Sequence, residues 1–386
     1  MTDTSTIYAD YQATTPLDPR VRERMAPFWR ESFGNPHSSD HAVGWQAHRA
    51  VEDGAASVAA LIGADADEIV FTSGATEANN LALFGLTGHA PSGPHRILVS
   101  AIEHKCILAA CRAIAARKGF KIEMIPVDHE GMLDLSALEA ALEDDVLMAS
   151  VMAVNNEVGT IQDLPAISEL LSSRNIPFHC DAAQAPSAMD MKYLAHHADM
   201  ISLSAHKMYG PQGIGALYIR RNLQNRIEPL IYGGGQQNGL RSGTLPLPLC
   251  VGMGAAAELA ANSDAAVERA RVALQRDQFV CLLRDGGADI VLNGSQTDRR
   301  HPGNANLQFT GCEAEWILTS LQPALAASSG AACTSGTPEP SHVLRAMSLS
   351  AEESDASIRF SFGRFTTDEE VNIAARLVLQ ALQTDQ

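Results

Sequence analysis

Four short stretches of this 386-residue chain combine polar side chains with glycine and other small residues in patterns that suit ligand chemistry. The first stretch, 73–77 (SGATE), lies between the apolar run EIVF and a helical pattern. A glycine turn followed by a helix start offers backbone N–H groups and the positive end of the helix dipole, which together suit a phosphate. The hydroxyl of Thr76 adds a donor. A plain helix N-cap explains the same residues, and this stretch alone does not decide between the two.

Asp181 closes a second apolar run, IPFHC, and is followed by Ala182, Ala183 and Gln184. A carboxylate at the end of a buried strand needs a partner, and a protonated ring nitrogen of a ligand would be one. A helix cap or an ordinary ion pair is the more common explanation of an aspartate at such a position.

Lys207 ends the third stretch, 202–207 (SLSAHK), which is followed by the glycine-rich loop GPQGIG. A lysine that is shielded from water gives up its proton more easily, and the neutral amine can form a Schiff base. Ser204 and His206 could donate hydrogen bonds to a phosphate. Because a lone lysine in a loop is usually just solvated, only the surrounding pattern favours a reactive Lys207.

Cys333 lies in the fourth stretch, 327–336 (ASSGAACTSG), with Pro338 and Pro340 following. This composition indicates an accessible loop in which a thiol could react. A small buried residue in a tight turn is an equally good explanation. The other six cysteines have apolar neighbours in the sequence and are expected to fill the core: Cys106, Cys111, Cys180, Cys250, Cys281 and Cys312. Their odd total, scattered spacing and lack of a CxxC pair argue against a disulfide framework and against a zinc or other metal site.

The overall composition is that of an acidic globular protein, with a net charge of -17 and a sequence pI near 5.1. Such a chain is a poor candidate for direct nucleic-acid binding. The first ten residues are polar and acidic, and no apolar run is long enough to span a membrane. We therefore expect a cytoplasmic protein with reduced thiols.

The elements that must position these residues alternate between short apolar strands and helical patterns. Expected strands cover 68–71, 96–100, 121–127, 146–154, 176–183, 200–207 and 215–221. This order predicts an α/β fold with a mostly parallel sheet between layers of helices. Beyond about Pro248 the pattern predicts one long helix over 249–284 and strands at 303–309 and 357–362. We therefore expect a large domain at 18–255, and a smaller α+β domain, made of 1–17 and 256–386, that carries Cys333.

Together the four stretches resemble the NifS/IscS class of cysteine desulfurases, which are class-V-aminotransferase-like pyridoxal-phosphate enzymes of fold type I. The resemblance runs from Tyr8 to about Val371. Its matching stretches are YADYQATTPLDPRV, FGNPHSSDHAVGWQA, EIVFTSGATEANNLAL, EHKCIL, VNNEVGTIQD, DAAQ, SLSAHKMYGPQGIGALY, GGGQQNGLRSGTLP, SSGAACTSGTPEPSHVLRAM and IRFSFGRFTT. It implies a seven-stranded sheet in the large domain, and SSGAACTS with its long following loop resembles the subgroup with an extended cysteine loop.

The resemblance also implies roles for individual residues. Those assigned to pyridoxal 5'-phosphate are Ala75, Thr76, His104, Asp181, Gln184, Ser204, His206, Lys207 and Thr244. Lys207 would form the Schiff base and carry the substrate's α-proton, while Asp181 would keep the ring nitrogen protonated. His104 would cover the ring face and assist proton transfer. Thr244 would reach the phosphate of a neighbouring subunit, which implies a homodimer with shared sites.

The activity implied is the conversion of L-cysteine to L-alanine. Asn156 and Arg359 would bind the substrate carboxylate, Arg359 through a two-pronged contact. Cys333 would take the sulfur as a persulfide and pass it to an acceptor protein, for iron–sulfur cluster assembly, transfer-RNA thiolation or DNA phosphorothioation. Because the sequence stops at Gln386, soon after FGRFTTDEE, we expect docking to iron–sulfur scaffolds to differ from that of longer members.

Two other functions compete with this interpretation. A selenocysteine lyase or another aminotransferase-type enzyme would share the fold, but those reactions need no persulfide-forming cysteine such as Cys333. A non-catalytic sulfur-relay scaffold would not need Lys207, Asp181 and His104 together.

Overall fold

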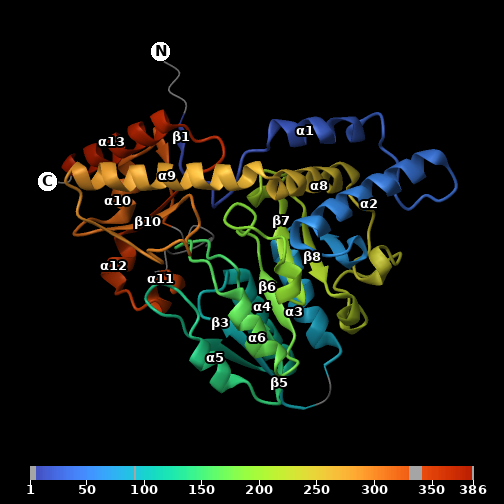
Figure 1. Ribbon diagram of the computed structural model, residues 1–386. Helices are drawn as coiled ribbons and strands as arrows, with labels where there is room; N and C mark the ends of the chain where they lie inside the picture. Colours follow the sequence, from blue (N-terminus) through green and yellow to red (C-terminus); the bar gives the residue numbers. More distant parts are fainter. Residues whose placement is uncertain (1–5, 91–92, 330–340, 385–386) are drawn as a thin grey trace.

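The computed structural model describes residues 6–90, 93–329 and 341–384 (Figure 1). A seven-stranded sheet lies at its centre in the order β2-β8-β7-β6-β5-β3-β4. Its strands are β2 (Ile69–Thr72), β3 (Arg96–Ser100), β4 (Lys121–Ile125), β5 (Val146–Ser150), β6 (Phe178–Asp181), β7 (Met200–Ser204) and β8 (Gly215–Ile219). Only β8 runs antiparallel to its neighbours in this sheet. The predicted α/β fold with a mostly parallel seven-stranded sheet is therefore confirmed.

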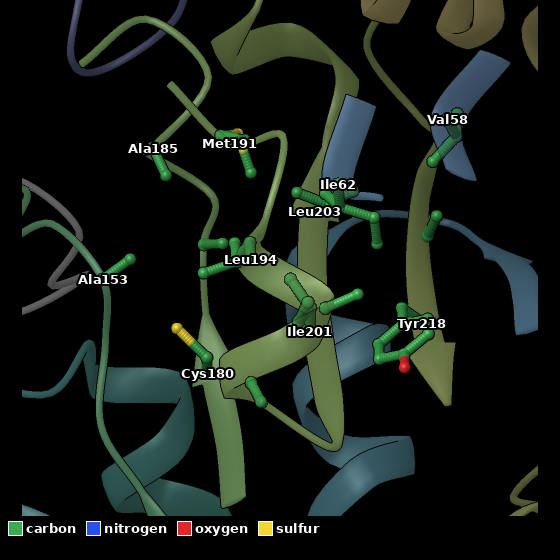
Figure 2. Close-up of a cluster of buried hydrophobic side chains, with 14 of the residues drawn as sticks. Val58, Ile62, Ala153, Cys180, Ala185, Met191, Leu194, Ile201, Leu203 and Tyr218 are labelled. Carbon is green, nitrogen blue, oxygen red and sulfur yellow. The ribbon is translucent and has the colours of Figure 1, made fainter. Parts of the chain in front are cut away.

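Helices cover both faces of this sheet (Figure 1). The helices of the N-terminal two thirds of the chain are α1 (Pro19–Met25), α2 (Ala42–Ile62), α3 (Ala75–Gly88), α4 (Lys105–Lys118), α5 (Leu135–Ala141), α6 (Leu164–Ser172), α7 (Leu194–His197) and α8 (Leu247–Ala261). Because successive strand residues point to opposite faces, Ile201 and Leu203 join one buried cluster while Met200 joins another. Figure 2 shows the first cluster, in which Ile201 and Leu203 of β7 lie near Ile62 of α2.

A second, smaller sheet has its own hydrophobic cluster. Strand β10 (Asn304–Phe309) lies between β9 (Ile290–Leu292) and β12 (Ser357–Ser361), and both pairings are antiparallel. Helices α9 (Asp264–Asp285) and α13 (Asp368–Thr384) pack against this unit, with α10 (Ala314–Ser320), α11 (His342–Ala346) and α12 (Ala351–Asp355) nearby (Figure 1). The short strand β1 (Ile7–Tyr8) pairs with β11 (Leu325–Ala326) and adds the N-terminal segment to it. The domain boundaries at 17/18 and 255/256 stay a prediction.

The expectation of one helix over 249–284 is wrong, because the chain breaks between α8 and α9 at Asn262 and Ser263. Asn262 has an extended backbone, and its side-chain oxygen accepts hydrogen bonds from the N–H groups of Asp264 and Ala265. This local hydrogen bonding starts a new helix instead of continuing the old one.

Several strands also end earlier than expected. β4 ends at Ile125, β5 at Ser150 and β7 at Ser204, where the chain leaves the sheet. Residues Ala205–Lys207 form a 3-10 turn instead of continuing the strand. Among the residues that the structure describes, no helix has the length and apolar character needed to cross a membrane.

Candidate active site

One cavity of about 600 Å³ opens at the ends of the central strands. Its lining includes most of the residues singled out from the sequence: Ala75, Thr76, His104, Asn156, Asp181, Gln184, Ser204, His206, Lys207 and Arg359. Thr244 is exposed and does not line the cavity. Cys333 lies outside the described residues. The carboxyl ends of parallel strands meet at one edge of a sheet, which explains why residues distant in sequence gather here.

The start of α3 forms one wall of the cavity. Gly74, at the N-cap, has a φ of 152° and provides no side chain to cap the helix. The backbones of Gly74 and Gly215 lie close together. A Cβ on Gly215 would be only 2.7 Å from the Cα of Gly74, so a larger residue would not fit at position 215. The helix start therefore presents backbone N–H groups, with the Thr76 hydroxyl beside them, toward the cavity.

His206 and Ser204 line the same cavity after β7. His206 Nδ1 lies 3.0 Å from Thr14 Oγ1. Burial, with a smaller effect of the neighbouring Lys207 charge, lowers the pKa of His206 to about 4. This side chain is therefore neutral near pH 7 and can serve as a hydrogen-bonding group without adding charge.

Asp181 ends β6 and is 5% exposed. Its Oδ2 accepts a hydrogen bond from Asn79 Nδ2 at 2.7 Å, and its Oδ1 accepts one from the Ala183 N–H at 3.0 Å. The nearby Glu103 is fully buried, and its carboxylate oxygen accepts from the Met152 N–H. Burial, reinforced by the charge of Asp181, raises the pKa of Glu103 well above its usual value. Of these two side chains only Asp181 lines the cavity, so it is the one placed to face a cationic ligand.

Lys207 follows β7 on the 3-10 turn, and the backbone of the N-terminal segment holds its amine. Nζ donates to the carbonyl oxygens of Gln12 and Ala13, the latter at 2.8 Å. Gln184 Nε2 donates to the same Gln12 carbonyl at 2.9 Å. The N-terminal segment was expected to belong to the smaller domain. Its residues 12–14 also line the cavity, which the sequence argument missed although the stretch QAT is part of the resemblance.

His104 begins α4 as its N-cap residue. Its Nδ1 accepts the backbone N–H of Cys106 at 3.2 Å and lies 3.0 Å from Cys106 Sγ. The Cys106 thiol lines the cavity and lies 3.2 Å from Asn79 Nδ2. Asn79 and Cys106 are thus two further residues of the site that sequence reasoning did not assign.

The expectation that six cysteines fill the core is wrong for three of them. Cys106 lines the cavity, Cys281 is exposed and Cys312 is half-buried. The remaining three are buried, namely Cys111, Cys180 and Cys250. Apolar neighbours in the sequence did not reveal that the first three lie on helix or loop surfaces, because burial depends on which face the rest of the fold covers.

Arg359 lies on β12 and is 4% exposed. Its Nη1 donates to the Asn156 carbonyl at 2.7 Å, and its Nη2 donates to Asp10 Oδ1 at 2.6 Å and to Ser328 Oγ at 2.8 Å. Nε has no hydrogen-bond partner within the described part of the chain. A buried guanidinium that is held by its Nη atoms and has an unsatisfied Nε suits a carboxylate ligand.

Comparisons with known proteins agree with this geometry. The model of the aminotransferase class-V family matches residues 7–373. The chain is 47% identical over 372 residues to cysteine desulfurase IscS of Rickettsia prowazekii (strain Madrid E), covering 96% of this chain and 90% of that protein. A solved structure described as a NifS-like protein has a TM-score of 0.91 and 32% identity, covering 98% of this chain and all of that one.

A second solved structure, described as SspA in complex with cysteine, has a TM-score of 0.82 and 34% identity. The alignment covers 94% of this chain and all of that one. Both the sequence and the structural similarities extend over nearly the whole chain, including every segment that lines the cavity. The chain therefore belongs to the class-V aminotransferase family and, within it, to the cysteine desulfurases of the NifS/IscS class, which depend on pyridoxal phosphate.

Proposed function

We propose that this chain converts L-cysteine to L-alanine and holds the sulfur as a persulfide on Cys333. One observation carries the proposal: a single cavity brings together the amine of Lys207, the buried carboxylate of Asp181, the imidazole of His104 and the guanidinium of Arg359. An amine, a carboxylate for a ring nitrogen and a cation for an amino-acid carboxylate are the groups that such a reaction requires.

The cavity fits pyridoxal phosphate in the chemistry of its donors. The start of α3, with Ala75 and Thr76, would bind the phosphate together with Ser204 and His206. Asp181, at the end of β6, would pair with the ring nitrogen, and Gln184 would hydrogen-bond the ring oxygen. When bound, the cofactor supplies an electron sink for the negative charge that forms at the substrate's α-carbon.

The chain's own residues would then bind the substrate and move its protons. Arg359 and Asn156 would hold the carboxylate of cysteine and so fix the direction of its α-hydrogen. Lys207 would take the α-proton and return it later, since a neutral amine held in the cavity can act as a general base. His104 would assist this transfer.

The sulfur step would belong to Cys333. Its thiolate would attack the substrate's sulfur, so that an S–S bond forms while the carbon–sulfur bond breaks and alanine is left as the other product. The persulfide would pass to an acceptor protein. We also propose a homodimer in which Thr244, exposed on the single chain, completes the phosphate site of the partner subunit.

The direct test is to supply the purified, cofactor-loaded protein with L-cysteine and a dithiol reductant. We expect alanine and sulfide in equal amounts, and we expect Cys333→Ser to keep the bound cofactor while losing sulfide release. Alanine from L-selenocysteine but not from L-cysteine would identify a selenocysteine lyase instead. A protein that never takes up the cofactor would fit the sulfur-relay scaffold.

A further inference from the structure

Cys106 lies inside the cavity but has no part in the reaction proposed above. It is the second residue of α4, and its Sγ is 3.0 Å from His104 Nδ1 and 3.2 Å from Asn79 Nδ2. Asn79 Nδ2 is in turn 2.7 Å from Asp181 Oδ2. Two side chains, Cys106 and Asn79, therefore connect His104 to Asp181.

The donors and acceptors in this chain of contacts have a definite direction. A carboxylate only accepts hydrogen bonds, so the group of Asn79 that faces Asp181 must be its NH2. That NH2 has two hydrogens, one for Asp181 Oδ2 and one for Cys106 Sγ. Because the sulfur accepts from Asn79, its own S–H is available to donate to His104 Nδ1.

His104 Nδ1 thus has two donors directed at it. The Cys106 backbone N–H donates to it at 3.2 Å, and the Cys106 thiol lies 3.0 Å away. A ring nitrogen that accepts hydrogen bonds cannot carry the ring proton, so the neutral imidazole must carry it on Nε2. The hydrogen bond at one ring nitrogen fixes the role of the other, as it does for histidines that bind metals.

We propose that Cys106 is a positioning residue that holds His104 as the Nε2–H tautomer and ties this tautomer, through Asn79, to the carboxylate of Asp181. The inference rests on the proposed function, since His104 matters to the reaction only if the cavity binds the cofactor and substrate. Its consequence is that Nε2 of His104 acts as a donor. Taking the α-proton is then left to Lys207.

The thiol contributes only part of this control. The Cys106 backbone N–H stays in place whatever the side chain, so removing the thiol removes one of two donors to Nδ1. Losing one hydrogen bond of ordinary strength corresponds to a fall in kcat of about fivefold. Serine keeps a donor and an acceptor at the same position, whereas alanine keeps neither.

The test compares Cys106→Ala, Cys106→Ser and the exposed-site control Cys281→Ala as cofactor-loaded proteins labelled with ¹⁵N in their histidine rings. His104→Gln identifies the His104 signals by their loss. We expect well-separated Nδ1 and Nε2 signals of one tautomer in the unchanged protein, in Cys106→Ser and in Cys281→Ala. In Cys106→Ala the two signals should move part of the way toward each other, because only the backbone N–H of residue 106 then favours the Nε2–H tautomer.

Kinetics give a second measurement. Cys106→Ala should lower kcat about fivefold with the KM for cysteine within about twofold, and Cys106→Ser should restore kcat to within about twofold. Unchanged ring signals in Cys106→Ala would overturn the proposal. The ring signals are recorded without substrate, so they test the role of Cys106 even if the protein does not turn over L-cysteine. A failure to turn over L-cysteine would count against the proposed function alone.

Discussion

Replacing Arg359 by lysine tests how the cavity holds an amino-acid substrate. The guanidinium is anchored by Asn156, Asp10 and Ser328 through its two Nη atoms, and its Nε has no partner among the described residues. Lysine keeps the positive charge beside Asp10 but cannot present a planar fork to a carboxylate. The variant is therefore predicted to remove the proposed two-pronged contact without leaving Asp10 unpaired.

The expected rise in KM follows from the number of hydrogen bonds that Arg359 would make to the substrate carboxylate. One of two charge-assisted hydrogen bonds to the substrate is lost, which costs about 1.5–3 kcal/mol. The KM for L-cysteine should therefore rise about 10- to 150-fold. Because Lys207 and Asp181 are untouched, kcat should change much less. Inhibition by cysteamine, which has no carboxylate, should be unaffected.

Arg364→Lys is a matched control. Arg364 is also largely buried and forms two ion pairs, with Asp18 and Glu268, each at 2.8 Å, but it does not line the cavity. Steady-state kinetics and urea unfolding of both variants separate a loss of binding from a loss of stability. If Arg359→Lys kept the KM within twofold of the unchanged protein, or if Arg364→Lys raised it equally, the assignment of the substrate carboxylate to Arg359 would be wrong.

Three further predictions concern the cofactor, the dimer and the dependence of stability on pH. Lys207→Ala should lose the yellow, borohydride-reducible form of the bound cofactor, and survival of that form would remove Lys207 from its role. Dimers that combine a Lys207→Ala subunit with a Thr244→Val subunit should regain about half of the normal activity. In such a dimer one of the two shared sites has both residues intact. No gain in activity on mixing would argue against a contribution of Thr244 across the interface. Burial lowers the pKa of His179 to about 4 and that of His301 to about 3, compared with about 6.5 in the unfolded chain. The unfolded state therefore binds more protons below pH 6.5, and the free energy of unfolding should fall toward pH 4 by up to about 1.4 kcal/mol per pH unit for each histidine. Urea titrations at several pH values measure this slope, which His301→Asn should reduce.

The sequence was sufficient to predict the large sheet and most of the residues singled out here that line the cavity. Short apolar runs separated by helical patterns can be buried only as a sheet covered on both faces, as β3, β5, β6 and β7 are. Asp181 ends β6 and Lys207 follows β7, and these two strands are adjacent in the sheet, so the proximity of the two residues follows from the topology. The break at Asn262 was missed because the residues on both sides favour helix, whereas the Asn262 side chain accepts hydrogen bonds that start a second helix.

By itself, then, the sequence determined the fold class and the residue types in the cavity, because strand and helix patterns and strand-end motifs are local properties of the chain. Which residues these cavity residues contact was determined only by the tertiary structure. Asp10 meets Arg359 across 349 positions, and Asn79 meets Asp181 across 102. Such contacts form because separate hydrophobic clusters bring distant segments of the chain together. This arrangement cannot be predicted from a local sequence pattern. For the same reason the carbonyls of Gln12 and Ala13, and the thiol of Cys106, became part of the site only when the chain was folded.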